Sequence, residues 1–148
     1  MGVSATGNPG AGSGSTMTLP ASVANIEKII AFLEGELEKR GCPVRTCMQI
    51  CLAADEVMAN IAMYAYEHGG GDVTVQFDYD GTERVAAITF TDSGIPFDPL
   101  AKKDPDVGLP AEERKIGGLG IFLVKKTMDE IRYRREDGRN ILCIRKRI

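Results

Sequence analysis

The 148-residue sequence is poor in several residue types on which common kinds of site are built. It has no Trp, a single His (His68) and four Cys, none of which form a C-x-x-C pair, so the spacing of zinc and dithiol redox sites is absent. No apolar run approaches the roughly 18 residues of a membrane-spanning helix. The first residues also lack the basic and then apolar stretches of a secretory signal. We therefore expect a cytoplasmic protein with reduced thiols and no membrane partner.

Charge is unevenly distributed along the chain. The net charge is −3, but residues 1–130 carry 11 Lys and Arg against 19 Asp and Glu, whereas residues 131–148 carry 7 against 2. An acidic body argues against direct binding of nucleic acid. The basic end is interpreted either as an ordinary half-exposed strand face or as a surface for an acidic partner.

The length fits one domain with a single hydrophobic core. Residues 1–17 are rich in Gly, Ser, Ala and Thr, and this composition predicts a flexible tail or leader. Residues 18–148 are then the folded domain, and they contain no internal repeat.

Hydrophobic periodicity predicts the order of elements. Two helices are expected at about 22–40 and 44–67, the second with apolar side chains nearly all round and therefore buried. Strands follow near 73–79 and 84–91, and a long loop leads to a helix after Gly120. Two closing strands meet at Asp137-Gly138, a pair typical of a tight hairpin turn. Helices and hairpins are segregated, which predicts a two-layer α+β sandwich.

The first cluster of chemical interest is Glu56 and Asn60 in the second helix. Residues four apart share one helix face, and a carboxylate beside a carboxamide offers the hard oxygen ligands that suit Mg²⁺. The simpler interpretation is a solvated polar patch. The apolar surroundings argue against it, because buried polar groups require partners.

The second cluster is Asp92-x-Gly94-x-Pro96, which directly follows a predicted strand. Asp92 can accept a hydrogen bond from an exocyclic amine such as adenine N6, and Gly94 allows a flat ligand to approach the backbone. An ordinary Asx-turn is the alternative.

The third cluster is Gly117-Gly118-Leu119-Gly120 before a helix. Glycines expose backbone N–H groups, and the positive end of the following helix favours phosphate. The sequence has neither a G-x-x-x-x-G-K-[ST] loop nor a G-x-G-x-x-G turn in a βαβ unit, so P-loop and Rossmann sites are not expected.

In this order the three clusters resemble the Bergerat (GHKL) ATP-binding fold. Further residues around them are similar to the anti-sigma factor serine kinases of the RsbW type: Tyr64-Ala65-Tyr66, Ile95-Pro96-Phe97-Asp98-Pro99 and Ile121-Phe122-Leu123-Val124-Lys125. The resemblance covers about residues 18–148. It implies a mixed, mostly antiparallel sheet covered on one face by about three helices.

The resemblance also implies roles for individual residues. Glu56 would be the general base for a protein serine, Asn60 would bind Mg²⁺, and Asp92 with Gly94 would recognise the adenine of ATP. Gly117, Gly118 and Gly120 would contact its phosphates, and residues 98–116 would form the ATP lid. The implied partners are a sigma factor and an antagonist protein of the STAS type, and a homodimer is expected.

Two positions depart from the family pattern. Tyr64 stands where family members usually have His. A Thr near the last hairpin often supports the adenine-binding Asp, and here Asn140 is the residue that could take its place. Two other interpretations therefore stay open: a module of the same fold that binds ATP and sequesters a partner without catalysis, and a detached ATPase domain of the histidine-kinase type.

Overall fold

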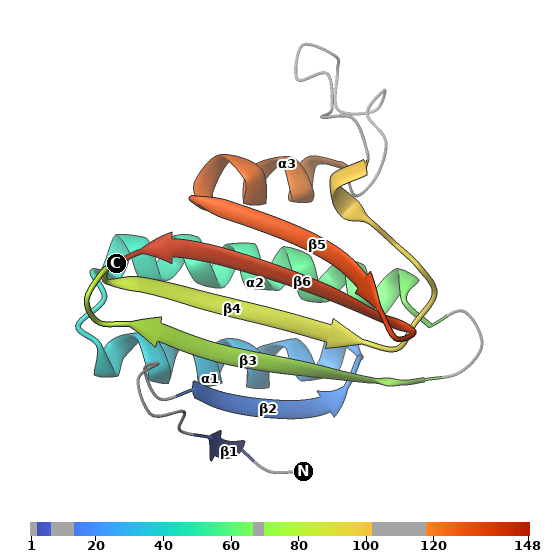
Figure 1. Ribbon diagram of the computed structural model, residues 1–148, viewed down its shortest axis with the longest axis horizontal. Coiled ribbons are helices and arrows are strands. Elements are labelled where there is room, and N and C mark those ends of the chain that lie inside the picture. Colours follow the sequence, from blue (N-terminus) through green and yellow to red (C-terminus); the bar gives the residue numbers. More distant parts are fainter. Residues whose placement is uncertain (1–2, 7–13, 67–69, 102–117) are drawn as a thin grey trace.

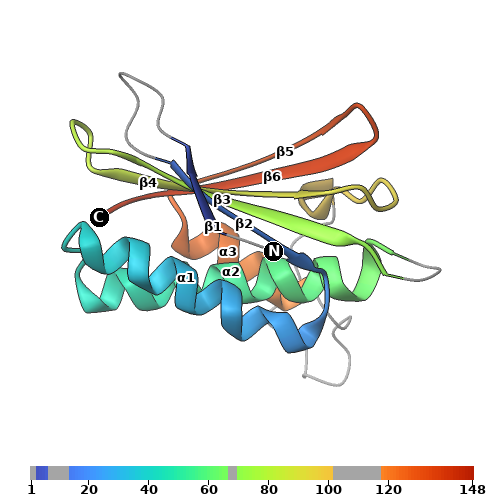
Figure 2. The ribbon, with the colours of Figure 1, turned by 90° about the horizontal axis from the view of Figure 1, so that it is seen from below.

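The structure is a computed structural model that describes residues 3–6, 14–66, 70–101 and 118–148. Its strands and helices are, in chain order, β1 (Val3–Thr6), β2 (Gly14–Pro20), the 3₁₀ helix η1 (Val23–Asn25), α1 (Ile26–Lys39), α2 (Val44–Tyr64), β3 (Asp72–Asp80), β4 (Val85–Asp92), the 3₁₀ helix η2 (Pro99–Ala101), α3 (Gly118–Thr127), β5 (Glu130–Glu136) and β6 (Arg139–Arg147). All three α-helices cover the same face of the sheet (Figures 1 and 2). The predicted two-layer α+β sandwich is confirmed.

The described strands form one six-stranded sheet in the order β1-β2-β3-β4-β6-β5. Every pairing in it is antiparallel. The resemblance implied a mixed sheet, and the described part of the sheet contains no parallel pair. The predicted hairpin turn is present, with Asp137 and Gly138 both at positive φ, as a type I′ turn requires. Because β6 pairs with β4, the C-terminal hairpin reaches the end of β4 and sets Asn140 opposite Asp92.

The N-terminal segment differs from the predicted tail of residues 1–17. β2 begins at Gly14 and pairs along β3, with Met17 opposite Val75, and β1 pairs in turn with β2. Pairing of backbone groups does not require large side chains, so a segment rich in Gly, Ser and Thr can extend the sheet. The prediction is therefore wrong for residues 3–6 and 14–17, whereas residues 1–2 and 7–13 lie outside the described part.

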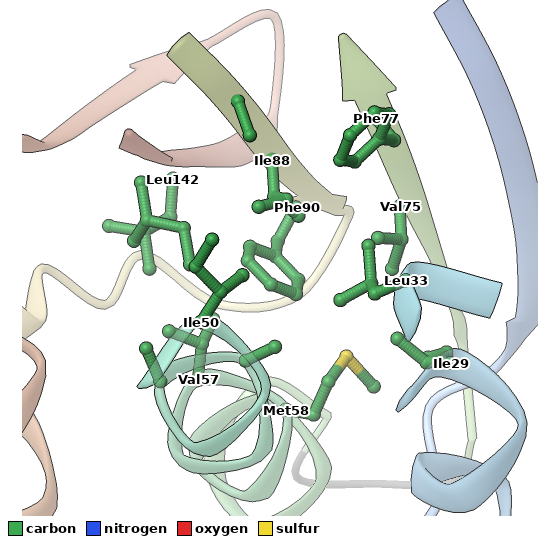
Figure 3. Packing of buried hydrophobic residues seen from close by; sticks show 14 of the residues in the cluster. Ile29, Leu33, Ile50, Val57, Met58, Val75, Phe77, Ile88, Phe90 and Leu142 are labelled. Atoms are coloured by element: carbon green, nitrogen blue, oxygen red, sulfur yellow. The ribbon is translucent and has the colours of Figure 1, made fainter. Parts of the chain in front are cut away.

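The hydrophobic core lies between the sheet and the helices (Figure 3). Alternate residues of β3, β4 and β6 point to the covered face, and their buried side chains include Phe77, Phe90 and Ile144. They pack against buried residues of α1 and α2, among them Ile29, Leu33, Ile50, Val57 and Met58. This packing fixes the face of α2 that carries Val57, and with it the direction of the site residues nearby.

The outer side of α2 corrects a second prediction. The helix is not buried all round, because Val44, Met48 and Leu52 are 77%, 60% and 63% exposed. These residues are four apart and so form one stripe along the helix. In a two-layer fold the described chain has no third layer to cover that stripe.

No helix among the described residues is long and apolar enough to cross a membrane.

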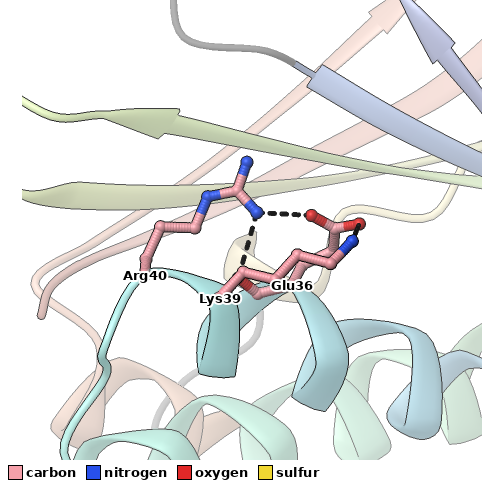
Figure 4. Close-up of polar contacts among 3 residues, drawn as sticks. All are labelled: Glu36, Lys39 and Arg40. Atoms are coloured by element: carbon pink, nitrogen blue, oxygen red, sulfur yellow. Dashed lines mark hydrogen bonds and ion pairs between the residues drawn. The ribbon is translucent and has the colours of Figure 1, made fainter.

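A partly buried ion pair closes the far end of α1 (Figure 4). Arg40 Nη1 donates to Glu36 Oε2 at 2.5 Å, and its guanidinium lies over the Phe77 ring at 5.1 Å. Burial by itself would raise the pKa of Glu36, but hydrogen bonds from Arg40 and Lys39 outweigh it, and the pKa of this carboxyl is lowered. The pair ties α1 to the sheet far from the clusters identified in the sequence.

Candidate functional site

A small pocket lies where α2 crosses the ends of β4 and β6. It has a volume of about 30 Å³, which is room for no more than a water molecule or two. Its walls are mostly apolar and include Val57, Ile61, Ala65, Phe90, Phe97, Pro99, Ile121, Tyr133 and Leu142. The polar residues Asn60, Asp92 and Asn140 also line it. The structure therefore brings Asn60 and Asp92, from two of the predicted clusters, into one pocket.

Asp92 ends β4 and is only 5% exposed. Its Oδ1 accepts hydrogen bonds from the Gly94 backbone N–H and from Asn140 Nδ2, each at 2.9 Å. No hydrogen bond from the described residues reaches Oδ2. One carboxylate oxygen is thus held by the protein, while the other can accept a hydrogen bond from a ligand.

Asn140 is the centre of the polar network around this carboxylate. Its Nδ2 also donates to the Ile95 carbonyl at 2.7 Å. Its Oδ1 accepts from Tyr133 Oη at 2.6 Å and from Arg135 Nη1 at 3.2 Å. The structure therefore places Asn140 where the resemblance called for a residue supporting Asp92, and it fixes the orientation of the carboxamide from both sides.

Gly94 allows a close contact inside the protein, whereas the sequence led us to expect that it lets a flat ligand approach the backbone. A Cβ at this position would lie 2.1 Å from the Ala65 carbonyl oxygen and 2.7 Å from the Ala65 Cβ. The next residue, Ile95, donates its N–H to the same carbonyl at 2.8 Å. The glycine thus lets the loop after β4 pack on the C-terminal end of α2. This contact anchors the loop beside Asp92.

Glu56 is half-buried on α2, one turn before Asn60. Burial raises the pKa of its carboxyl, and the neighbouring Asp55 carboxylate raises it further. A carboxylate with a raised pKa is a stronger base once it is ionised, which suits general-base chemistry near neutral pH. Perturbed carboxyl groups beside a pocket are also common at functional sites.

Asn60 has the chemistry of a Mg²⁺ ligand. Its Nδ2 donates to the Glu56 carbonyl at 3.0 Å, and no hydrogen bond from the described residues occupies its Oδ1. No group of three or more His, Cys, Asp and Glu in the described part of the chain is placed to hold a metal ion. A Mg²⁺ ion bound through one protein oxygen, phosphates and water needs no such group, so the residues present fit it.

The glycine cluster is described in part. Gly117 and most of the predicted lid, residues 102–116, lie outside the described residues. Gly118 is the first residue of α3, and Gly120 follows in its first turn. A Cβ on Gly120 would lie 2.0 Å from Glu56 Oε2. The absence of a side chain at Gly120 therefore leaves the space that the Glu56 carboxylate occupies.

Three residues at or beside the pocket were assigned no role from the sequence: Tyr133 and Phe97 line it, and Arg135 contacts Asn140. Tyr133 and Arg135 lie on the inner side of β5, and Arg135 also donates to the Gly94 carbonyl at 2.7 Å. Phe97 stacks on Tyr64 with ring centroids 5.6 Å apart. Alternation along residues 131–135 places Tyr133 and Arg135 on one side. Only the pairing of the hairpin with β4 shows that this side faces Asp92.

Comparison with known proteins shows the family of the chain and two of its relatives. The family model of the histidine kinase-like ATPase domain matches residues 19–146. A relative from Bacillus cereus, called serine-protein kinase RsbW, is 27% identical over 132 residues, which are 85% of this chain and 80% of the relative. A protein of the same name from Listeria monocytogenes is 27% identical over 131 residues, covering 86% and 83% of the two chains.

Proposed function

The chain belongs to the histidine kinase-like ATPase domain family, and from this premise we propose that it is an ATP-dependent serine-protein kinase. The observation that carries the proposal is the Asp92 carboxylate, buried at the pocket with one oxygen held by Gly94 and Asn140. The other oxygen can accept the exocyclic amine of adenine. The apolar walls suit the flat faces of a purine ring.

The pocket must open for a purine to enter. A volume of about 30 Å³ is too small for an adenine ring. Phe97 and Pro99 belong to the segment that leads toward the predicted lid, and both line the pocket. We propose that nucleotide binding displaces this segment and separates Phe97 from Tyr64.

Glu56 and Asn60 would carry the transfer step. Glu56 takes the proton of a serine hydroxyl on the partner protein as the serine oxygen forms its bond to the γ-phosphorus. The bond from that phosphorus to the bridging oxygen breaks, and ADP leaves. Asn60 would hold Mg²⁺, which neutralises charge on the phosphates, and the backbone N–H groups at Gly117, Gly118 and Gly120 would contact them.

The resemblance to the anti-sigma factor serine kinases extends the proposal to partners. The protein would bind and restrain a sigma factor, and its serine substrate would be an antagonist of the STAS type. It would act in the cytoplasm as a homodimer. Its four cysteines are free, which fits a reducing compartment.

A two-step experiment tests the proposal. Thermal melting with and without Mg²⁺-ATP measures nucleotide binding, and the expected result is a rise in Tm. Labelled ATP is then mixed with the protein and a STAS-type antagonist, and transfer of label to a serine is expected. A Tm shift without transfer to any antagonist would instead support the non-catalytic, partner-sequestering alternative. No shift and no transfer would contradict both.

A further inference from the structure

The outer face of the helical layer carries a groove that the nucleotide site does not use. Met48 and Leu52 of α2 form its exposed apolar ridge. On the other side stand residues of α1, which lies beside α2 on the surface away from the sheet (Figure 2). We infer that this groove binds an amphipathic helix with basic flanks, supplied by a partner protein.

The groove is large and its floor is apolar. Its volume is about 490 Å³, and its apolar lining comprises Ile26, Ile30, Ala31, Cys47, Met48, Cys51 and Leu52. Burial and the neighbouring Cys47 raise the pKa of Cys51 to about 12. The thiol is therefore protonated at neutral pH and contributes an apolar wall rather than a charge or a nucleophile.

The charged residues at the groove have one sign. Glu27 and Glu34 of α1 and Asp55 of α2 line it together with the apolar side chains. Among the described residues that line it there is no Lys, Arg or His. An apolar floor with an acidic rim is complementary to a ligand with an apolar stripe flanked by Lys or Arg.

The dimensions favour a helix as the ligand. Met48 and Leu52 of the groove are one helical turn apart. The exposed Val44 continues the same stripe beyond the groove, so that the stripe spans about two turns or ~12 Å. A helix laid between two neighbouring helices can insert its own ridge of residues spaced three and four apart. An amphipathic helix of a few turns therefore matches both the length and the shape of the exposed stripe.

The acidic rim argues against two other occupants. In a two-fold symmetric contact the same patch meets itself, so Glu27, Glu34 and Asp55 of one copy would face the same carboxylates of the other. Anionic lipid headgroups would be repelled in the same way.

The basic end of this chain is unsuited for a different reason, because Arg145, Lys146 and Arg147 lie in β6 and already form ion pairs with acidic residues.

The test uses a fluorescein-labelled helical peptide of about five turns, with Leu spaced three and four apart and Lys at the other positions. A matched peptide carries Glu in place of Lys. Fluorescence anisotropy should show that the Lys peptide binds at least about tenfold more tightly, and that added salt weakens it. Amide chemical-shift changes should concentrate at Ile30, Met48 and Leu52. Equal binding of both peptides, or shifts centred elsewhere, would overturn the inference.

Two double variants test separately the contribution of the apolar contact and the contribution of charge to peptide binding. Met48→Gln with Leu52→Gln removes the stripe without changing charge, and the affinity for the Lys peptide should fall about tenfold or more. Met63→Gln is the control, because Met63 is 59% exposed on the same helix and does not line the groove. Glu27→Lys with Glu34→Lys should reverse the preference between the peptides. Unchanged affinity in the first double variant would contradict the inference.

Two further measurements complete the test. Sedimentation of the unmodified protein and of the Met48→Gln, Leu52→Gln variant shows whether the groove is instead a contact between copies. If the unmodified protein is a dimer and the double variant is a monomer, the groove is a contact between copies and the inference is overturned. The Tm shift with Mg²⁺-ATP should be the same in every groove variant. A failure of peptide binding with this shift intact therefore counts against the groove alone, not against the proposed kinase.

Discussion

The two ends of the candidate site are built in different ways. At the end of β4, Asp92 and Asn140 are each 5% exposed and share a closed set of hydrogen bonds with Gly94, Ile95 and Tyr133. At the α2–α3 contact, Glu56 is half-buried, and the space beside its carboxylate exists because Gly120 has no side chain. The proposed adenine site is held by many hydrogen bonds, whereas the proposed general base is held by packing.

This difference separates binding from chemistry. A network with several mutually supporting bonds is rigid and costly to break, so the geometry proposed to select a purine is set by the fold itself. A carboxylate with a raised pKa is instead tuned by burial and by one neighbouring charge. Substitutions at the two ends should therefore affect different measurements.

The largest effect is expected for Glu56→Gln. The amide is close in shape but cannot take the serine proton, so phosphoryl transfer should fall by about 10²- to 10⁴-fold. Nucleotide affinity should change little, because Glu56 is not at the adenine end. Labelled transfer to the antagonist and calorimetric titration with ADP measure the two quantities. Transfer at the rate of the unmodified protein would remove Glu56 from its proposed role.

Asp92→Asn should give the opposite pattern. Replacing one carboxylate oxygen by an NH₂ group removes the acceptor for the adenine amine, and the lost charged hydrogen bond corresponds to roughly a hundredfold in ADP affinity. Asp78→Asn is a matched control, since Asp78 lies on β3 away from the pocket lining. If Asp92→Asn binds ADP as tightly as the control does, Asp92 does not recognise the base.

Asn140→Ala tests whether the network supports Asp92. The change leaves Asp92 Oδ1 with the Gly94 N–H as its remaining donor and frees the Ile95 carbonyl. The free energy of unfolding should fall by about 1–3 kcal/mol, measured by denaturant titration, and ADP affinity by about tenfold. Asn140→Thr supplies one donor and should restore part of the affinity. The network explanation fails if Asn140→Ala loses stability alone and its ADP affinity is unchanged.

Local patterns in the sequence were enough for the layers and for the position of Asp92. Alternation over Val73–Tyr79 predicts a strand with one buried face, and the next predicted strand, at about 84–91, places Asp92 directly at its end, where β4 indeed ends. The contact of Asp92 with Asn140 joins residues 48 apart in the chain. It depends on the pairing of β6 with β4, which no local pattern determines.

Two errors have the same origin in missing tertiary context. Periodicity shows which faces of α2 are apolar, but whether Met48 and Leu52 are covered depends on a further layer of structure, and their exposure shows that the described fold provides none. In the N-terminal segment, Gly14 to Met17 carry a weak strand signal and are ordered by their pairing with β3. Tertiary context overrides local propensity in both cases.

The smallest effect, and the sharpest test of the tuning at Glu56, is expected for Asp55→Asn. The Asp55 carboxylate raises the pKa of Glu56 in addition to burial, so removing this charge should lower that pKa. Since the proposed base acts in its ionised form, the acid limb of the pH–rate profile for transfer should move to lower pH. Glu27→Gln, a groove residue that does not adjoin Glu56, should leave the limb in place.

The same substitution makes a linked prediction for stability. A carboxyl whose pKa is raised by folding stabilises the folded state at low pH, and this contribution is lost as the pH rises through the folded pKa. Asp55→Asn lowers that folded pKa toward the unfolded value, so the loss above it becomes smaller. The fall in Tm between acidic and neutral pH should therefore be shallower in the variant than in Glu27→Gln. Parallel Tm curves, together with an unmoved acid limb, would show that burial alone tunes Glu56.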